Sequence, residues 1–353
     1  MRRNNKYVGL DVHQATTVAT VRVPGGKVIC RSVLATESTN LLEFFNSMRG
    51  SVHVAFEEGT QAQWLYDLLR PVVDQVTVCD KRGEHRGNKG DQKDADSLSH
   101  RLLCGDLRSV YHGSGSLRDL QELTSSYVTL VEDSTRAMLR IKALFRARAI
   151  GVKGAQVYAR ANRKEFLGKL EKPGVALRAE TLFAQLDVLR DLRPRVKAAM
   201  IAAARREKAF GILCSIPFVG PVRAALLIAT MKTPWRFRNK RNLWAYAGLA
   251  VVTESSADHV FVAGRAVRRS RKPLTRGLNK NHNRILKGVF KGMAIAAKSG
   301  RGELCDFYGA MVARGMREEM ARVTLARKLA AITLRLWKRG ELYDSTKLVV
   351  QSQ

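Results

Sequence analysis

The chain has 353 residues, and its 62 Lys and Arg against 31 Asp and Glu give a formal net charge of +31. A chain this basic attracts phosphate backbones by counterion release, so nucleic acid is the predicted partner. An anionic membrane is the rival, but no apolar stretch reaches the roughly 20 residues that cross a bilayer, and the first residues lack the apolar core of a signal peptide. Five scattered cysteines without a C-x-x-C pair indicate neither a disulfide framework nor a zinc ribbon. We therefore expect a soluble, cytoplasmic protein.

The N-terminal third has a strand-rich pattern. Short apolar and β-branched runs predict strands at 7–10, 16–23, 27–33, 52–56 and 75–79, with a Pro-Gly-Gly turn at 24–26. Helices are expected at 41–48 and 64–69. Three meandering strands followed by alternating helices and strands favour an α/β domain with a mixed, ribonuclease-H-like sheet, which we place at residues 1–112.

The apolar period changes from residue 114 onward. Leu117, Leu120, Tyr127, Val131, Met138, Ile141 and Phe145 recur at three- and four-residue steps, which is typical of a coiled-coil seam. A second seam runs from residue 182 to 200, and Pro194 within it is expected to kink its helix. We predict a helical coiled-coil arm at 113–208, either as an antiparallel hairpin or as a dimer interface. Ordinary amphipathic core helices are the plainer alternative.

A third, mainly α-helical region is expected at 209–341, followed by a tail at 342–353. Residues 212–230 predict two helices around a tight turn at 216–221, which resembles a helix-hairpin-helix that offers backbone amides to a phosphate. Phe218 stands where such turns usually have a glycine, so a plain corner between two helices is the alternative. A loop is expected at 251–257, a strand at 259–262, and further helices at 284–297 and 318–338.

Four acidic residues stand out in the basic N-terminal third. Asp11 and Glu57 each end an apolar run, and at the carboxyl ends of adjacent strands their side chains would converge. Asp91 and Asp94 are three residues apart, on one face of a helix that begins there. Carboxylates without His or Cys suit Mg²⁺ or Mn²⁺, so we predict that these four residues bind a metal ion. For the last pair, acids that meet the helix macrodipole are the alternative.

Several short motifs occur in an order that resembles one family. They are Gly9-Leu10-Asp11-Val12-His13, Phe56-Glu57-Glu58-Gly59-Thr60 with Trp64, residues 89–95, Ile216-Pro217 with Gly220-Pro221, residues 235–237 and 243–249, Ser255-Ser256-Ala257, and Thr275-Arg276-Gly277-Leu278-Asn279. Over nearly the whole chain, this set resembles the DEDD-type insertion-sequence transposases related to Piv invertases, which are now regarded as bridge-RNA-guided recombinases. Each motif is short, and two separate blocks in the right order make the resemblance specific.

The resemblance implies catalytic roles. The predicted metal ligands Asp11, Glu57, Asp91 and Asp94 fill the acidic tetrad of the family's RuvC-like domain. Their neighbours Glu58 and Asp96 are alternatives. The family's catalytic serine maps to Ser256 by its distance from the Gly-Leu pair at 248–249. Ser255 is the alternative, because the chain has Ala257 and Val251 where many members have Gly and Pro.

The implied function is transposition by cleaving and rejoining DNA strands. Attack by the serine hydroxyl would store the broken bond as a phosphoserine ester, assisted by Mg²⁺ or Mn²⁺. The implied partners are double-stranded donor and target DNA, a structured non-coding guide RNA, and further copies of the chain in a dimer or tetramer, close to the bacterial nucleoid when active. The rivals are a RuvC-like, metal-dependent junction nuclease that activates water and a non-catalytic RNA-binding protein.

Basic stretches of the third region form the predicted nucleic-acid surface. They combine many cations with few acids and lie near aromatic residues, which favours phosphate tracking with some base stacking over a solvated basic face. The predicted contact residues are Trp235, Arg236, Arg238, Lys240, Arg241, Arg268, Arg269, Arg271, Lys272, Arg276, Asn279 and Lys280. Such contacts position a backbone without reading its sequence.

Overall fold

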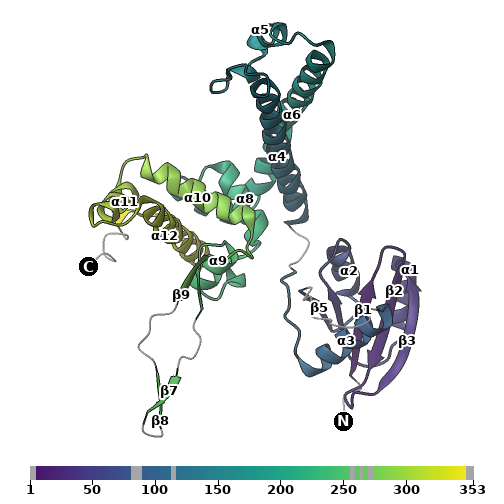
Figure 1. Ribbon diagram of the computed structural model, residues 1–353. Helices are drawn as coiled ribbons and strands as arrows, with labels where there is room; N and C mark the ends of the chain where they lie inside the picture. Colours follow the sequence, from purple (N-terminus) through teal and green to yellow (C-terminus); the bar gives the residue numbers. More distant parts are fainter. Residues whose placement is uncertain are drawn as a thin grey trace. The chain divides into compact units, whose positions relative to one another are not determined.

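The computed structural model describes residues 5–80, 90–112, 117–254, 259–262, 265–268 and 274–346. The chain forms two compact units, Met1–Ser116 and Leu117–Gln353, and each is described by itself (Figure 1). No helix within the described ranges is long and apolar enough to cross a membrane. The finer division of the chain at residues 112, 208 and 341 stays a prediction.

The first unit is built on a five-stranded sheet. Its strands are β1 (Lys6–Val12), β2 (Thr16–Arg22), β3 (Val28–Ala35), β4 (Val52–Glu57) and β5 (Gln75–Cys79), in the order β3-β2-β1-β4-β5. The first three strands form an antiparallel meander, β4 runs parallel to β1, and β5 runs parallel to β4. The predicted α/β mixed sheet is therefore confirmed, whereas its ribonuclease-H-like or RuvC-like classification stays a prediction.

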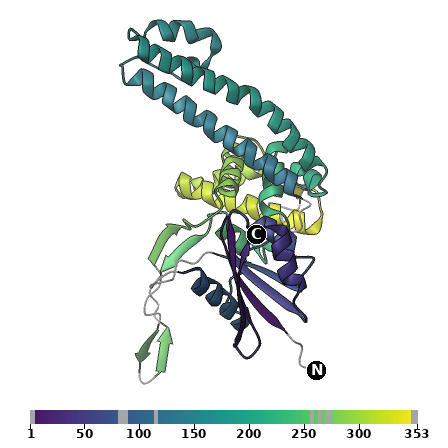
Figure 2. The same ribbon diagram turned by 90° about the vertical axis from the view of Figure 1, so that its right-hand side faces the viewer.

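Helices cover both faces of this sheet (Figure 2). On one face α1 (Ser38–Asn46) and α2 (Ala62–Leu69) pack against Val8, Leu10 and Phe56, and these residues share the apolar core of the unit. Side chains alternate along a strand, so Gly9 and Asp11 belong to the opposite face, against which α3 (Asp91–Cys104) packs. The alternation in β1 thus directs the large apolar side chains into the core and leaves Gly9 and Asp11 on the face that α3 covers.

Gly9 permits a very close approach of α3 to β1. A Cβ at this position would lie 2.3 Å from the carbonyl oxygen of Ala95 and 2.4 Å from the amide nitrogen of Ser99. Both atoms belong to the α3 backbone, so only a residue without a side chain fits here. Arg22 of β2 adds a hydrogen bond of 2.9 Å from Nε to the Ser99 hydroxyl. These contacts fix α3 beside β1.

The second unit begins with an antiparallel helical hairpin, which we call the arm. α4 (Arg118–Arg146) packs against α6 (Pro173–Arg205), and the chain turns between them through η2 (Gln156–Tyr158), η3 (Arg160–Asn162) and α5 (Arg163–Gly168). Leu120, Tyr127, Ile141 and Phe145 are buried along α4, as the seam pattern predicts. α6 continues through Pro194 as a single helix. Of the two predicted arrangements, the antiparallel hairpin is present within one chain.

An ion-pair cluster ties the outer end of the arm together. Arg163 donates from Nη1 and Nη2 to the two carboxylate oxygens of Asp187, at 2.6 and 2.7 Å, and Arg160 Nε lies 3.3 Å from the same carboxylate. The hydrogen bond from Arg163 is the main cause that lowers the pKa of Asp187 to about 2. Because this value lies below the ordinary 3.8, the carboxylate stabilises the fold above about pH 4 and loses its contribution as the pH falls toward 2.

Replacing Asp187 by Asn is expected to lower the free energy of unfolding by about 1 to 2 kcal/mol at pH 7. The difference from the wild type should stay constant down to about pH 4 and shrink below it, and urea titrations over a pH series would measure it. Asp191→Asn is the matched control, because this carboxylate is 70% exposed and lies 3.4 Å from Arg160. A stability difference that does not depend on pH would contradict the prediction.

The rest of the second unit is a helical core. It contains α7 (Ala209–Ser215), α8 (Pro221–Met231), η4 (Pro234–Arg236), α9 (Lys240–Tyr246), α10 (Arg284–Lys298), α11 (Glu303–Ala313) and α12 (Glu318–Arg339). Two strand pairs join it, β6 (Val251–Glu254) with β9 (Leu274–Leu278) and β7 (His259–Val262) with β8 (Arg265–Arg268). The mainly helical character is confirmed. β7 agrees with the expected strand, β6 forms where a loop was expected, and α9, α11, β8 and β9 were not predicted. Basic and small residues in the β8 and β9 segments hid the apolar alternation that usually marks strands.

The tight turn between α7 and α8 is held by Phe218. Its φ is +67°, in the left-handed region where a side chain costs roughly 1 kcal/mol. A Cβ on Gly300 would lie 2.9 Å from the Phe218 ring, so the absence of a side chain there makes room for the aromatic ring. Arg223 Nη1 donates to the Phe218 carbonyl at 2.6 Å. The predicted pair of helices around a turn is thus confirmed, and phosphate binding by the turn stays a prediction.

Candidate active site

Asp11 and Glu57 lie on neighbouring strands of the first unit. Leu10 of β1 is paired with Phe56 of β4 in parallel register, so the next residue of each strand, Asp11 and Glu57, reaches the same edge and the same face of the sheet. Glu57 is the last residue of β4 and is half-buried. The sequence-based expectation that two acids end adjacent strands is therefore met by the geometry.

The other two predicted ligands begin α3. Asp91 and Asp94 both lie in its first turn, where carboxylates also meet the positive end of the helix macrodipole. Gly90 precedes the helix with an extended backbone. The close contact of α3 with Gly9 keeps this turn on the same sheet face as Asp11.

His13 joins two of the predicted ligands in a compact cluster. Its Nε2 lies 3.1 Å from Asp11 Oδ2 and 3.6 Å from Asp91 Oδ1. One ligand atom from each of the three residues lies within 4.8 Å of the others. In the described part of the chain this is the group of three that satisfies the spacing for a shared metal ion, and Glu57 and Asp94 lie outside it.

Electrostatics at Asp11 show that its neighbours share one environment. Burial raises the pKa of Asp11, the charge and hydrogen bond of His13 lower it, and the negative charges of Asp94 and Asp91 raise it further. Asp94 is therefore close enough to act on Asp11 even though it is not part of the three-residue cluster. A nearby cation would stabilise the charged form of carboxylates that raise one another's pKa in a partly buried place.

The residues present suit a divalent metal ion. Two carboxylates provide the oxygen ligands that Mg²⁺ and Mn²⁺ prefer, and an imidazole also suits first-row transition metals. His13 was missing from the predicted set, which assumed carboxylates alone. Its position two residues after Asp11 was the available signal, because residues i and i+2 share one face of an extended chain.

The two acidic alternatives are engaged elsewhere. Glu58 Oε2 lies 2.6 Å from Nε2 of the buried His112. Asp96 accepts two hydrogen bonds from Arg31, at 3.2 and 2.8 Å, and the hydrogen bond from Arg31 is the main cause that lowers its pKa. Glu57 lies beside Asp11 in the strand register and the charge of Asp94 acts on Asp11, which favours Glu57 over Glu58 and Asp94 over Asp96 as site residues. The assignment of the full tetrad stays a prediction.

Some predicted nucleic-acid contacts are accessible. The Trp235 side chain is 71% exposed, and Arg238, Lys240, Arg241 and Lys280 are also exposed. These residues are placed where a nucleic acid can reach them, and their role stays a prediction.

Two other predicted contacts serve the protein itself. The Arg236 guanidinium stacks over the Tyr246 ring at 4.4 Å and donates to the Thr230 carbonyl at 3.3 Å. The Asn279 side-chain amide donates to the carbonyl oxygens of Ala245 and Asn281. Both side chains hold local structure in this unit.

The remaining predictions fall outside the described side chains. Ser255, Ser256, Arg269, Arg271 and Lys272 lie outside the described residues. Arg268 in β8 and Arg276 in β9 are described for their backbone alone. In the sequence, Ser255 and Ser256 directly follow β6.

Comparisons with known families place the chain in the transposase class. A DEDD model of the IS110 type, described as "Transposase", matches residues 8–148, which span the sheet, α3 and α4. A second model, described as "Transposase IS116/IS110/IS902 family", matches residues 211–299 of the helical core. The chain belongs to the IS110 family of transposases.

One curated relative is similar to part of the chain. It is the "Insertion element IS110 uncharacterized 43.6 kDa protein" of Streptomyces coelicolor, which is 26% identical over 165 residues. The match covers 47% of this chain and 38% of the relative. The chain thus spans about two fifths of the length of that relative.

Proposed function

We propose that this protein is a transposase that cleaves and rejoins DNA strands with the help of a divalent metal ion at the acidic site of the first unit. The cluster of Asp11, His13 and Asp91 is the observation that carries the proposal. Family membership supplies the substrate class, because insertion-sequence transposases act on DNA.

The residues of the site have different proposed roles. Asp11 and Asp91 would hold the metal ion directly, and Glu57 and Asp94 add negative charge around it. When bound, the ion would polarise a phosphodiester and offset the negative charge that develops during cleavage. His13 Nε2 lies 3.1 Å from Asp11 Oδ2 and 3.6 Å from Asp91 Oδ1, so it could offer the ion a third ligand atom.

We further propose two routes for the attack on the phosphodiester. In the first, the Ser256 hydroxyl attacks the phosphorus, forms a phosphoserine ester and releases a DNA hydroxyl that can later reverse the step. In the second, a water molecule attacks and the acidic site acts as a RuvC-like nuclease. The motif around Ser256 supports the first route, and the match to the DEDD model fits the second better.

Trapping a covalent adduct separates the two routes. Wild-type protein, incubated with a nicked DNA substrate and Mg²⁺ or Mn²⁺, is expected to yield a denaturant-resistant protein–DNA species. Ser256→Ala should fold and bind DNA normally yet form no adduct, while Ser255→Ala serves as the control and keeps substantial activity. Mapping the modified peptide identifies the nucleophile. Cleavage without any adduct would establish the water route, and an adduct on Ser255 would correct the assignment.

A structured guide RNA is the proposed source of target choice. Contacts from Lys and Arg to a backbone carry no sequence information, so a chain of net charge +31 would hold the guide and leave sequence recognition to base pairing. Sequencing RNA that co-purifies with the protein from its native host tests this. A non-catalytic RNA-binding protein would retain that RNA and show no divalent-dependent cleavage of any DNA.

A further inference from the structure

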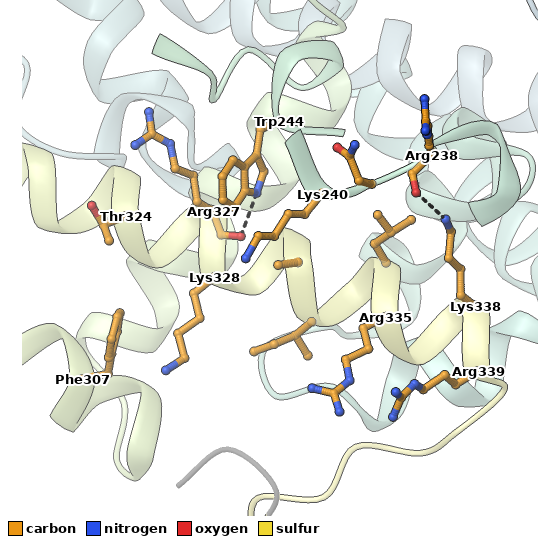
Figure 3. A pocket seen from close by; sticks show the side chains of 14 residues that line it. Arg238, Lys240, Trp244, Phe307, Thr324, Arg327, Lys328, Arg335, Lys338 and Arg339 are labelled. Carbon is orange, nitrogen blue, oxygen red and sulfur yellow. Dashed lines mark hydrogen bonds between the residues drawn. The ribbon is translucent and has the colours of Figure 1, made fainter. Parts of the chain in front are cut away.

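A basic pocket lies in the second unit between α9, α11 and α12 (Figure 3). Its volume is about 910 Å³, and 14 residues line it. Seven of these are Arg or Lys and none is Asp or Glu. Its size is that of a ligand-binding pocket, and its charge calls for an anion.

One face of α12 supplies most of the cations. Lys328, Arg335 and Lys338 are seven and three residues apart, which places them on one side of the helix, and Arg327 lines the pocket beside Lys328. Thr324 and the residues Ala331 and Ile332 fill the same side between them. The opposite side of α12 is buried in the helical core through residues such as Leu325 and Leu329. The core thus fixes the orientation of the basic face.

Several cations are held in place before any ligand arrives. Lys328 Nζ lies 3.8 Å from the centre of the Phe307 ring. Arg327 Nε donates to the Leu249 carbonyl at 2.6 Å, and Lys338 Nζ donates to the Phe237 carbonyl at 2.6 Å. Side chains that are already ordered lose less conformational entropy on binding.

Two of these cations are also partly removed from water. Burial lowers the pKa of Lys328, which the charge of Glu303 partly offsets, and burial lowers the pKa of Arg327. No ion pair joins Lys328, Arg327 or Arg335 to a carboxylate within the described ranges. Partly burying a cation costs free energy, and an anionic ligand beside it would offset that cost.

We infer that this pocket binds the sugar-phosphate backbone of a single-stranded nucleic-acid segment. Cations beside aromatic rings such as Trp244 and Phe307 are the composition of channels that hold single strands. In Figure 3, Lys240 extends from the start of α9 across the pocket beside the Trp244 indole, whose Nε1 donates to the Arg327 carbonyl at 3.0 Å. The inference rests on the proposed function for the class of ligand and assigns it a site distinct from the acidic one.

Binding of short unstructured strands to the full-length protein tests the inference. The probes are fluorescent 12-nucleotide oligomers of thymidine (DNA) and of uridine (RNA), titrated over a salt series. For the double variant Lys328→Gln/Arg335→Gln, we expect the salt slope to fall by about 1.4, because each phosphate contact on a single strand contributes about 0.7. At 0.1 M salt, this change of about 1.4 in the slope corresponds to a loss of affinity of roughly 25-fold.

The matched control is the double variant Lys291→Gln/Arg314→Gln. It removes the same charges from exposed positions in α10 and at the end of α11 that do not line the pocket. Its slope and affinity should stay within about twofold of the wild type. An equal loss in both double variants would show that binding reflects overall charge, and no loss in the first would show that the strand does not contact the pocket. Either result would overturn the inference.

A chemical footprint locates the bound strand. Acetylation of Lys240 and Lys328 should fall when the thymidine or uridine oligomer saturates the protein, while acetylation of Lys291 should not. The oligomer that protects the two lysines shows whether the pocket binds DNA, RNA or both. Protection by a polyglutamate peptide and by neither strand would make the pocket a site for an acidic protein partner and overturn the inference.

The outcome is separable from that of the proposed function. If the wild-type protein cleaves DNA with a divalent metal but its pocket does not bind the oligomers, only the inference is refuted. Retained pocket binding in a protein that never cleaves DNA would refute the proposed function alone.

Discussion

Replacing Asp11 or Asp91 by Asn is expected to abolish divalent-dependent DNA cleavage while leaving DNA affinity near the wild-type level. Each substitution removes a carboxylate from the group that surrounds the proposed ion, and loss of even an outer-shell group typically costs about 10- to 100-fold. We therefore expect cleavage to fall by about 100-fold or more. Removing negative charge from a chain of net charge +31 does not weaken its attraction for phosphate. Single-turnover cleavage and DNA titrations measure the two quantities separately.

Asp96→Asn and Glu58→Gln are the matched controls. These residues lie next to predicted ligands in sequence, yet they pair with Arg31 and His112. Their loss should reduce stability slightly and leave most of the cleavage activity. Full activity in Asp11→Asn, or a dead Glu58→Gln beside an active Glu57→Gln, would contradict the site described here.

A methyl group at Gly9 is expected to damage both the fold and the site. In Gly9→Ala the new Cβ would press on two α3 backbone atoms that lie 2.3 and 2.4 Å away, so the helix must move. Overpacking of this kind costs about 3 kcal/mol, and a displacement of about 1 Å at a reacting centre can cost 100-fold in rate. Thermal unfolding and cleavage assays should therefore both report a large loss.

Gly25→Ala is the control for this prediction. Gly25 lies in the turn between β2 and β3, and a Cβ there would meet nothing within 4 Å. Its stability and activity should match the wild type. A Gly9→Ala protein as stable and active as Gly25→Ala would show that α3 can shift freely and that its contact with β1 does not position Asp91.

Much of the first unit was predictable because local patterns there agree with the tertiary fold. Short apolar runs predicted all five strands, and the spacing of Asp91 and Asp94 predicted where α3 begins. His13 was missed because the predicted ligand set contained carboxylates alone, and its distance from Asp91 depends on where α3 lies. The close contact at Gly9 was equally invisible, since it depends on residues about 90 positions away.

In the second unit, the helices were easier to predict than the surfaces they present. The sequence predicted a helix at α12, but none of its basic residues was among the predicted nucleic-acid contacts, because the pocket forms only where α9 and α11 lie beside α12. Strands β8 and β9 were missed because their segments contain many basic residues. The position of a catalytic serine rests on family resemblance alone, since no local physical pattern distinguishes it from a turn residue.

The length of the arm gives it mechanical leverage. α4 has 29 residues, so it is about 44 Å long, and a tilt of about 5° at one end moves the other by about 4 Å. Ser134 and Thr135 donate from their hydroxyls to the carbonyls of Leu130 and Val131, at 2.6 and 2.9 Å, and such bonds often bend helices. The part of α4 beyond this point, which ends at Arg146, is about 18 Å long, so a bend of about 5° here would move the end of the helix by about 1.6 Å, roughly half of one base-pair step.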